Sequence, residues 1–269
     1  MLRAAGHQPV ARVPPRLRRT ASLAFAKMAP SLGDASLAAL YAGMGDAELD
    51  GEKLLKASRT LLRTQGGAQP VPFAEPFRSV RLLAAPVVLP PPALRAVLAC
   101  LDECLSTLPP DGVFRTPVGK HHVTLFHTGR PGDARPTDAA GVEAEVALLR
   151  PLLSSTPPFA LRVEQLLLTD TGVLVLLYQT DDGAPLKLRS ALRSLLPASP
   201  AQQTVLLHSS LARLMDVPSP QTVAAIRARC AAATAELQGA VVRFDRVWHV
   251  VETSLPCDGD VTALPLMQL

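Results

Sequence analysis

The chain has 269 residues, 48% of them hydrophobic and 19% charged, a composition that indicates a globular protein and excludes a largely disordered one. Residues 1–33 hold six of the 27 Lys and Arg residues and no acidic residue, and this segment accounts for the net charge of +4. Positions 34–269 therefore carry 21 basic against 23 acidic residues, which excludes a broad basic face for duplex DNA.

The N-terminal segment, residues 1–33, is rich in Arg and free of acidic residues, which is typical of a transit peptide for a mitochondrion or chloroplast. A disordered basic tail, or initiation at Met28, remains an alternative that would leave the protein in the cytoplasm or nucleus. Residues 34–76 are expected to form an accessory segment, with one or two short amphipathic helices within Asp46–Arg63 and a linker at 66–76. No apolar run reaches the roughly 18 residues that span a bilayer, so no membrane association is expected.

From Phe77 onward, predicted strands and helices alternate up to residue 255, followed by a tail at 256–269. Strands are predicted at Val80–Val88, His122–His127, Phe159–Leu168, Val173–Gln179, Thr204–Leu214 and Val241–Glu252. Helices are predicted at Ala93–Leu105, Val142–Leu153, Leu186–Leu196 and Pro220–Leu237. Residues 169–172 (TDTG) join two of the strands as a hairpin. The order β-α-β-α-β-β-α-β-α-β predicts an α+β or mixed layer fold.

Two similar motifs stand 86 residues apart, each within a predicted strand. The first is a His-x-Thr unit at His122 and Thr124, and the second is a His-x-Ser unit at His208 and Ser210. Because side chains alternate along a strand, each histidine shares a face with its hydroxyl residue. One imidazole can then take a proton from an attacking water or hydroxyl while the other gives one to the leaving oxygen. The two hydroxyls can bind the non-bridging phosphate oxygens.

Paired motifs of this kind on two strands resemble those of the two-histidine phosphoesterase superfamily, which includes bacterial 2′-5′ RNA ligases and cyclic nucleotide phosphodiesterases. The resemblance covers about residues 77–253 in the expected element order. It implies two pseudo-symmetric lobes of antiparallel sheet with outer helices around a central cleft. It also implies that His122 and His208 are the acid/base pair and that Thr124 and Ser210 bind phosphate.

Further substrate contacts are predicted from residues that flank the two motif strands. A second phosphate or the neighbouring nucleotide is expected to contact one or more of Arg115, Lys120, Arg130 and Arg213. Phe126 follows the strand alternation to the cleft face and is a candidate for stacking on a base. Ordinary surface charge for the four basic residues, and burial in the core for Phe126, remain the alternatives.

The remaining histidines and cysteines are expected to be structural. His121 and His127 alternate to the face opposite His122, and His249 in the last strand is predicted to pack in the core. Cys100 and Cys104 stand four residues apart on a predicted helix and are expected to be free buried thiols. A metal pair there is disfavoured because no second Cys or His pair accompanies it. We therefore expect no metal and no cofactor.

These features predict a monomeric, metal-independent phosphodiesterase that acts on an RNA end or a small nucleotide, through a 2′,3′-cyclic phosphate or a 2′-5′ linkage. The direction of the reaction stays open, since the same geometry serves hydrolysis, cyclisation and ligation. The alternative is a non-catalytic nucleotide- or RNA-binding module that retains the two-histidine cleft.

Overall fold

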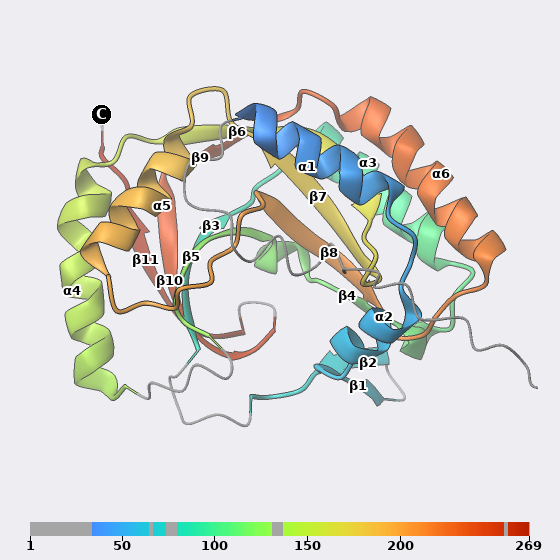
Figure 1. Cartoon of the computed structure of the whole chain (residues 1–269), viewed down its shortest axis with the longest axis horizontal. Coiled ribbons are helices and arrows are strands. Elements are labelled where there is room, and N and C mark those ends of the chain that lie inside the picture. Colours follow the sequence, from blue (N-terminus) through green and yellow to red (C-terminus); the bar gives the residue numbers. More distant parts are fainter. Residues whose placement is uncertain (1–33, 65–66, 74–79, 131–136, 256–257, 269) are drawn as a thin grey trace, which may run out of the picture. The chain divides into compact units, whose positions relative to one another are not determined.

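A computed structural model of the chain describes residues 34–64, 67–73, 80–130, 137–255 and 258–268 (Figure 1). The predicted transit segment at 1–33 lies outside these described residues. Within them, a four-stranded sheet contains, in spatial order, β11 (Asp258–Pro265), β10 (Arg246–Ser254), β3 (Arg81–Pro86) and β5 (His122–Gly129). A five-stranded sheet contains β4 (Val113–Arg115), β8 (His208–Leu214), β7 (Val173–Gln179), β6 (Phe159–Leu168) and β9 (Val241–Phe244). All strand pairs are antiparallel, which confirms the predicted α+β class with two lobes of antiparallel sheet.

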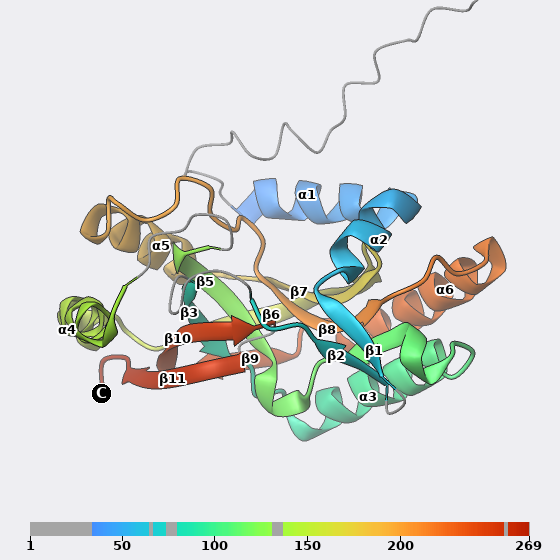
Figure 2. The same cartoon turned by 90° about the horizontal axis from the view of Figure 1, so that it is seen from below.

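Helices pack against both sheets. Against the four-stranded sheet, α4 (Ala139–Ser155) contacts β11 and α5 (Ala184–Leu195) contacts β5. Against the five-stranded sheet, α6 (Pro220–Leu237) packs on β6 and on α3 (Pro91–Leu105). Figure 2 shows α1 (Asp34–Asp46) on the opposite side of β7 and β8 from α3 and α6, and α2 (Gly51–Ser58) contacts β8. Every helix in the described part of the chain is too short or too polar to cross a membrane.

The helices begin and pack as their sequences dictate. Prolines open α3 and α6, where the missing N–H costs no hydrogen bond. The Asp50 carboxylate caps α2 by accepting from the Glu52 and Lys53 amides at 3.1 Å, and the Ser219 hydroxyl caps α6. The buried residues of α3 recur at helical spacing and face the core: Ala93, Val97, Cys100, Leu101, Cys104 and Leu105.

The accessory segment contains more structure than predicted. The helix expected within Asp46–Arg63 ends at Ser58, and β1 (Leu61–Thr64) takes its last residues. β1 pairs with β2 (Gly67–Pro70), so residues 67–70 of the expected linker form a strand. The preceding helix, α1, was missed; it buries Leu37 and Tyr41 on one face, but its small and apolar residues are spread around the helix without a clear period.

The C-terminal end of the chain also differs from the prediction. The single strand expected at Val241–Glu252 is two strands: β9 pairs with β6 in one sheet and β10 pairs with β3 in the other, with the break at Asp245. Residues 258–265, expected to be a tail, form β11 along β10. The short strand β4 was not predicted either, since three residues are too few for a detectable period.

Candidate active site

The two motif histidines lie in one pocket where the two sheets meet. Each is the first residue of its strand: β5 begins at His122, as predicted, and β8 begins at His208 instead of at Thr204. Thr124 and Ser210 line the same pocket, so the structure brings the four motif residues together. The other lining residues are Thr60, Leu61, Leu82, Phe114, Thr116, His127, Val173, Ala212, Arg213, Glu252 and Leu255.

Each histidine-bearing strand contains a β-bulge. In β5 the partners on β3 pass from Thr124 to Phe126, so Leu125 is the extra residue. In β8 the partners on β7 pass from Ser210 to Ala212, so Leu211 is the extra residue. An extra residue shifts the alternation of side chains by one position, and such bulges recur next to active sites.

The bulges correct two predictions based on strict alternation. His127 was expected on the opposite face from His122, but it lines the pocket. Phe126 was expected on the cleft face, but only 1% of it is exposed, and it packs in the core with the Arg193 guanidinium carbon 5.2 Å from its ring centre. The aromatic residue that lines the pocket is Phe114 of β4, opposite Arg213 in the strand pairing.

The ring of His122 has a defined orientation. Its Nδ1 lies 2.8 Å from the Lys120 carbonyl oxygen, which can only accept, so Nδ1 carries the proton. Burial lowers the pKa of His122, although the bond to Lys120 opposes this shift. At neutral pH the ring is therefore uncharged, with Nε2 available as a base.

The other two pocket histidines are uncharged for a similar reason. Burial, followed by the charges of His122 and Arg189, lowers the pKa of His208 to about 4. Burial and nearby cations lower the pKa of His127 to about 4. In both residues Nδ1 has no hydrogen-bond partner within the described part of the chain. A bound phosphate would raise the pKa values of these histidines, because a nearby negative charge favours the protonated imidazole.

The Arg189 side chain fixes β5 to the segment that leads into β8. The Arg189 guanidinium, on α5, donates to the carbonyls of Thr124 and Leu125 on one strand at 2.9 Å. It also donates to the carbonyls of Val205 and Leu206 before β8, at 2.8 and 2.9 Å. Two of these four bonds satisfy carbonyls of β5, an edge strand of its sheet, and together the four hold the two histidine-bearing segments in register.

Two further polar contacts join the same segments. The Gln203 amide accepts from the backbone N–H of His127 at 2.7 Å and donates to its carbonyl at 2.9 Å, as a paired strand would. The Ser209 hydroxyl donates to the His122 carbonyl at 2.8 Å. Neither Arg189 nor Gln203 was predicted, because nothing in the local sequence reveals that a distant helix and loop supply the missing partners of a strand.

Tyr41 of α1 supports the backbone beside His208. In a regular antiparallel pair, the Leu207 N–H would donate to the Tyr178 carbonyl. Here the Tyr41 hydroxyl lies between them, accepting from Leu207 at 3.2 Å and donating to Tyr178 at 2.9 Å. Burial raises the pKa of Tyr41 to about 12, so it remains a neutral donor. The accessory segment therefore contributes to the frame of the site.

The accessory segment also forms part of the pocket wall. Arg213 donates to the Ala57 carbonyl at 3.0 Å and lies 3.3 Å from the Thr60 hydroxyl, so α2 and the turn that follows it hold this guanidinium in place. Thr60 and Leu61 line the pocket beside it. Burial lowers the pKa of Arg213, but the group stays charged at neutral pH.

The other predicted substrate contacts lie outside the pocket lining. Arg115 binds Asp102 at 2.5 Å, Lys120 binds Asp258 at 2.5 Å, and Arg130 donates to the Gln202 carbonyl at 3.2 Å. Arg115 neighbours Phe114 on a strand, so the two side chains face opposite ways.

The two remaining predicted structural histidines are both buried. His121 is 2% exposed and does not line the pocket. His249 does not simply pack: its Nε2 donates to the Glu145 carboxylate at 2.8 Å, and the other oxygen of that carboxylate lies 3.3 Å from Nε of Arg81.

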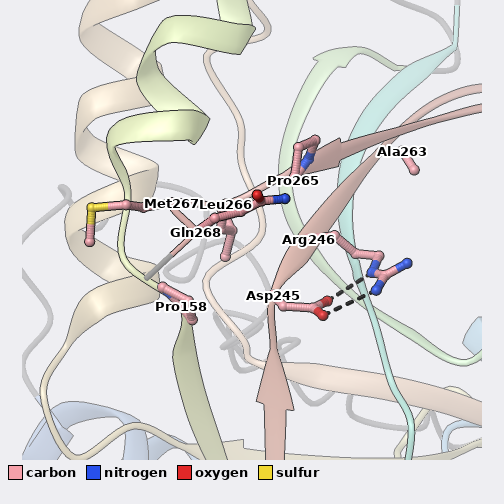
Figure 3. A pocket seen from close by; sticks show the side chains of 8 residues that line it. All are labelled: Pro158, Asp245, Arg246, Ala263, Pro265, Leu266, Met267 and Gln268. Carbon is pink, nitrogen blue, oxygen red and sulfur yellow. Dashed lines mark hydrogen bonds and ion pairs between the residues drawn. The ribbon is translucent and has the colours of Figure 1, made fainter.

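A second hollow lies at the end of β11 and has a different lining (Figure 3). Its charged groups, Asp245 and Arg246, bind each other at 2.7 and 3.0 Å, as the dashed lines show. The other lining residues are Pro158, Ala263, Pro265, Leu266, Met267 and Gln268. The hollow at the end of β11 has no histidine among its lining residues, and its two charged groups bind each other. The histidine pocket is therefore the candidate active site.

A family model described as the 2′-5′ RNA ligase superfamily matches residues 90–254, which is more than half of the chain. The chain belongs to this superfamily. The match spans both histidine motifs and excludes the accessory segment and β11. Membership supports a phosphodiesterase-type or RNA-processing function. The superfamily comprises two-histidine phosphoesterases, which confirms the resemblance recognised from the paired motifs.

Several solved structures are similar to the structure of this chain. The conserved protein of unknown function ATU0111 from Agrobacterium tumefaciens has a TM-score of 0.52 at 15% identity, over 77% of this chain and 90% of its own. TT0787 of Thermus thermophilus gives 0.48 at 17% identity, over 70% and 97% of the two chains. E. coli LigT complexed with phosphate gives 0.40 at 16% identity, over 72% and 100%. The similarity to ATU0111 shows a shared fold. No curated protein sequence matches the chain significantly.

Proposed function

We propose that this superfamily member is a metal-independent phosphodiesterase that acts on RNA ends or small nucleotides carrying a 2′,3′-cyclic phosphate or a 2′-5′ linkage. The observation that supports the proposal is the presence of His122, Thr124, His208 and Ser210 in one pocket. With the substrate phosphate bound, one neutral and one protonated imidazole provide a base and an acid, and two hydroxyls provide phosphate ligands, without a bound metal.

Hydrolysis of a cyclic phosphate illustrates the chemistry. Nε2 of His122 accepts a proton from water as the water oxygen bonds to phosphorus. The bond from phosphorus to one ribose oxygen breaks, and protonated His208 gives that oxygen its proton. His122 ends protonated and His208 neutral, and exchange with solvent restores both. The Thr124 and Ser210 hydroxyls donate to the non-bridging oxygens, where negative charge grows.

The pocket lining supports a nucleotide as the substrate. Phe114 offers an aromatic face on which a base can stack. Arg213 offers a cationic contact to the substrate in addition to protonated His208. The pocket also contains apolar side chains from four elements: Leu61, Leu82, Val173 and Ala212. A pocket with one aromatic residue and one arginine offers contacts for one or two nucleotides, and few for a long RNA strand.

The test is hydrolysis of a short RNA ending in a 2′,3′-cyclic phosphate, with a chelator present, by the full chain and its variants. His122→Ala and His208→Ala are each expected to lower kcat by about 10²- to 10⁴-fold, the usual contribution of a general acid or base. Arg115→Ala removes a charge outside the pocket lining and serves as the matched control.

The alternative, a binding module without turnover, makes a different prediction for the same proteins. The parent would bind the RNA end, and neither parent nor variants would hydrolyse it or a 2′-5′-linked dinucleotide. Turnover that survives in both histidine variants would refute the proposed mechanism.

A further inference from the structure

Three cysteine sulfurs lie together outside the histidine pocket. Cys100 and Cys104 are one turn apart on α3, and α6 packs against this face and contributes Cys230. The three Sγ atoms all lie within 4.8 Å of one another, and those of Cys100 and Cys104 are 3.8 Å apart. At most 4% of each residue is exposed. The sequence revealed only the pair on α3, because the third member is 126 positions beyond Cys104.

This spacing is that of ligands around one metal ion. Zinc binds thiolate sulfur at about 2.3 Å, so two sulfurs of a tetrahedral site lie roughly 3.8 Å apart. The separation between Cys100 and Cys104 equals this value without any rearrangement. Cys230, on another helix, needs at most a small side-chain adjustment. Within the described residues the group contains no fourth Cys, His, Asp or Glu ligand.

One cation, Arg229 of α6, lies beside the cluster and directly precedes Cys230 in the sequence. Arg229 binds Glu103 through one terminal nitrogen, while its buried Nε has no partner among the described residues. Three thiolates and the Glu103 carboxylate carry four negative charges, of which a divalent ion and the Arg229 guanidinium would balance three.

We propose that Cys100, Cys104 and Cys230 form a binding site for a divalent thiophilic cation of the zinc and cadmium class, which ties α3 to α6. All three sulfurs are needed, and binding releases the thiol protons. None of the three lines the histidine pocket, so the site is structural and independent of the proposed phosphodiesterase activity. An ion bound to the folded chain alone raises its stability by mass action.

The proposal is tested by titrating Cd²⁺ into the full chain, freshly reduced and stripped of metal. A thiolate-to-cadmium charge-transfer band should rise and saturate at one ion per chain, with an increase in Tm. Histidine ligands give no such band, so binding in the histidine pocket does not imitate the result. Zn²⁺ should then compete and remove the band.

Cys230→Ala should lose the band and the increase in Tm, and Cys257→Ala, which removes the remaining cysteine of the sequence, should keep both. Cys100→Ser provides an independent second variant if Cys230→Ala does not fold. No band in the parent chain, or a band that survives in Cys230→Ala, would overturn the proposal. Hydrolysis by the metal-stripped chain is measured in parallel, and its presence or absence does not alter the reading of either result.

Discussion

His127 and Arg213 occupy equivalent positions, each five residues after the motif histidine of its strand. In both strands a β-bulge between the hydroxyl residue and this position returns the side chain to the pocket face. The internal symmetry of the two motifs therefore extends beyond the His-x-Thr and His-x-Ser units. The two positions differ in chemistry: a neutral imidazole in one lobe and a permanent cation in the other. We infer that the Arg213 side of the pocket holds the more negative part of the substrate.

Substitution of Arg213 should weaken substrate binding. A hydrogen bond to a charged group contributes about 1.5–3 kcal/mol, so Arg213→Ala should raise KM by about 10- to 100-fold with a smaller effect on kcat. Arg115→Ala, which removes an arginine bound to Asp102 outside the pocket lining, should leave both constants unchanged. Steady-state kinetics on the two variants checks this, and equal effects would contradict the assignment.

Arg189 is expected to position both histidines without touching the substrate. Arg189→Lys keeps the charge but cannot form the four hydrogen bonds to β5 and the segment before β8. It should lower kcat by at least about tenfold, since a small misplacement of acid and base is costly. Arg189→Met removes the charge as well, which should raise the pKa of His208 and shift the pH profile upward. Identical pH profiles in the two variants would show that the charge of Arg189 does not act on His208.

Removing the Tyr41 hydroxyl should destabilise the protein. Tyr41→Phe leaves the Leu207 N–H and the Tyr178 carbonyl without their shared partner, which costs about 1–3 kcal/mol of unfolding free energy. Equilibrium denaturation in urea measures this loss. Because Leu207 precedes His208, kcat should fall more than KM rises. Unchanged stability would mean that, in the variant, the Leu207 N–H donates directly to the Tyr178 carbonyl.

The value of kcat/KM should be highest at acidic pH. His208 must be protonated to act as an acid, with a pKa of about 4, and His122 must be neutral, with a pKa below 6.5. The active combination is most populated between these two values, and kcat/KM should fall about tenfold per pH unit above 6.5. Exchanging the two roles leaves this expectation unchanged. An optimum above pH 8 would be inconsistent with histidine acid/base catalysis.

The lowered pKa values of His127 and His208 make folding stability fall in acid. Their folded pKa values lie below the unfolded value of 6.5, so the unfolded chain binds more protons. Stability is therefore fully present above pH 6.5 and is lost as the pH falls toward 4. Unfolding measured across this range separates a loss of fold from a loss of catalytic protonation.

The two phenylalanines near the motifs should respond differently to truncation. Phe126→Ala removes a fully buried ring and should cost about 3–5 kcal/mol of stability. Phe114→Ala should leave the fold largely intact and raise KM, since this ring lines the pocket. Thermal unfolding and steady-state kinetics on both variants distinguish the roles. A stability loss at Phe114 as large as at Phe126 would place Phe114 in the core.

The sequence by itself determined the helices and most strands of the two lobes. The strands Phe159–Leu168 and Val173–Gln179 and the helix Pro220–Leu237 were predicted at their observed bounds. Apolar residues dominate both strands, residues 169–172 form the turn between them, and Ser219 and Pro220 open the helix. It also selected His122, Thr124, His208 and Ser210, which the structure gathers in one pocket. Local alternation suffices for these four, because they precede the bulges in their strands.

The tertiary structure decided what depends on partners distant in sequence. The bulges at Leu125 and Leu211 are set by pairing with β3 and β7, so alternation alone misplaced His127 and Phe126. The roles of Arg189 and Tyr41 arise because a helix supplies hydrogen bonds that a neighbouring strand lacks. Side-chain period is a local property of the chain, whereas register and the satisfaction of backbone groups belong to the assembled sheets.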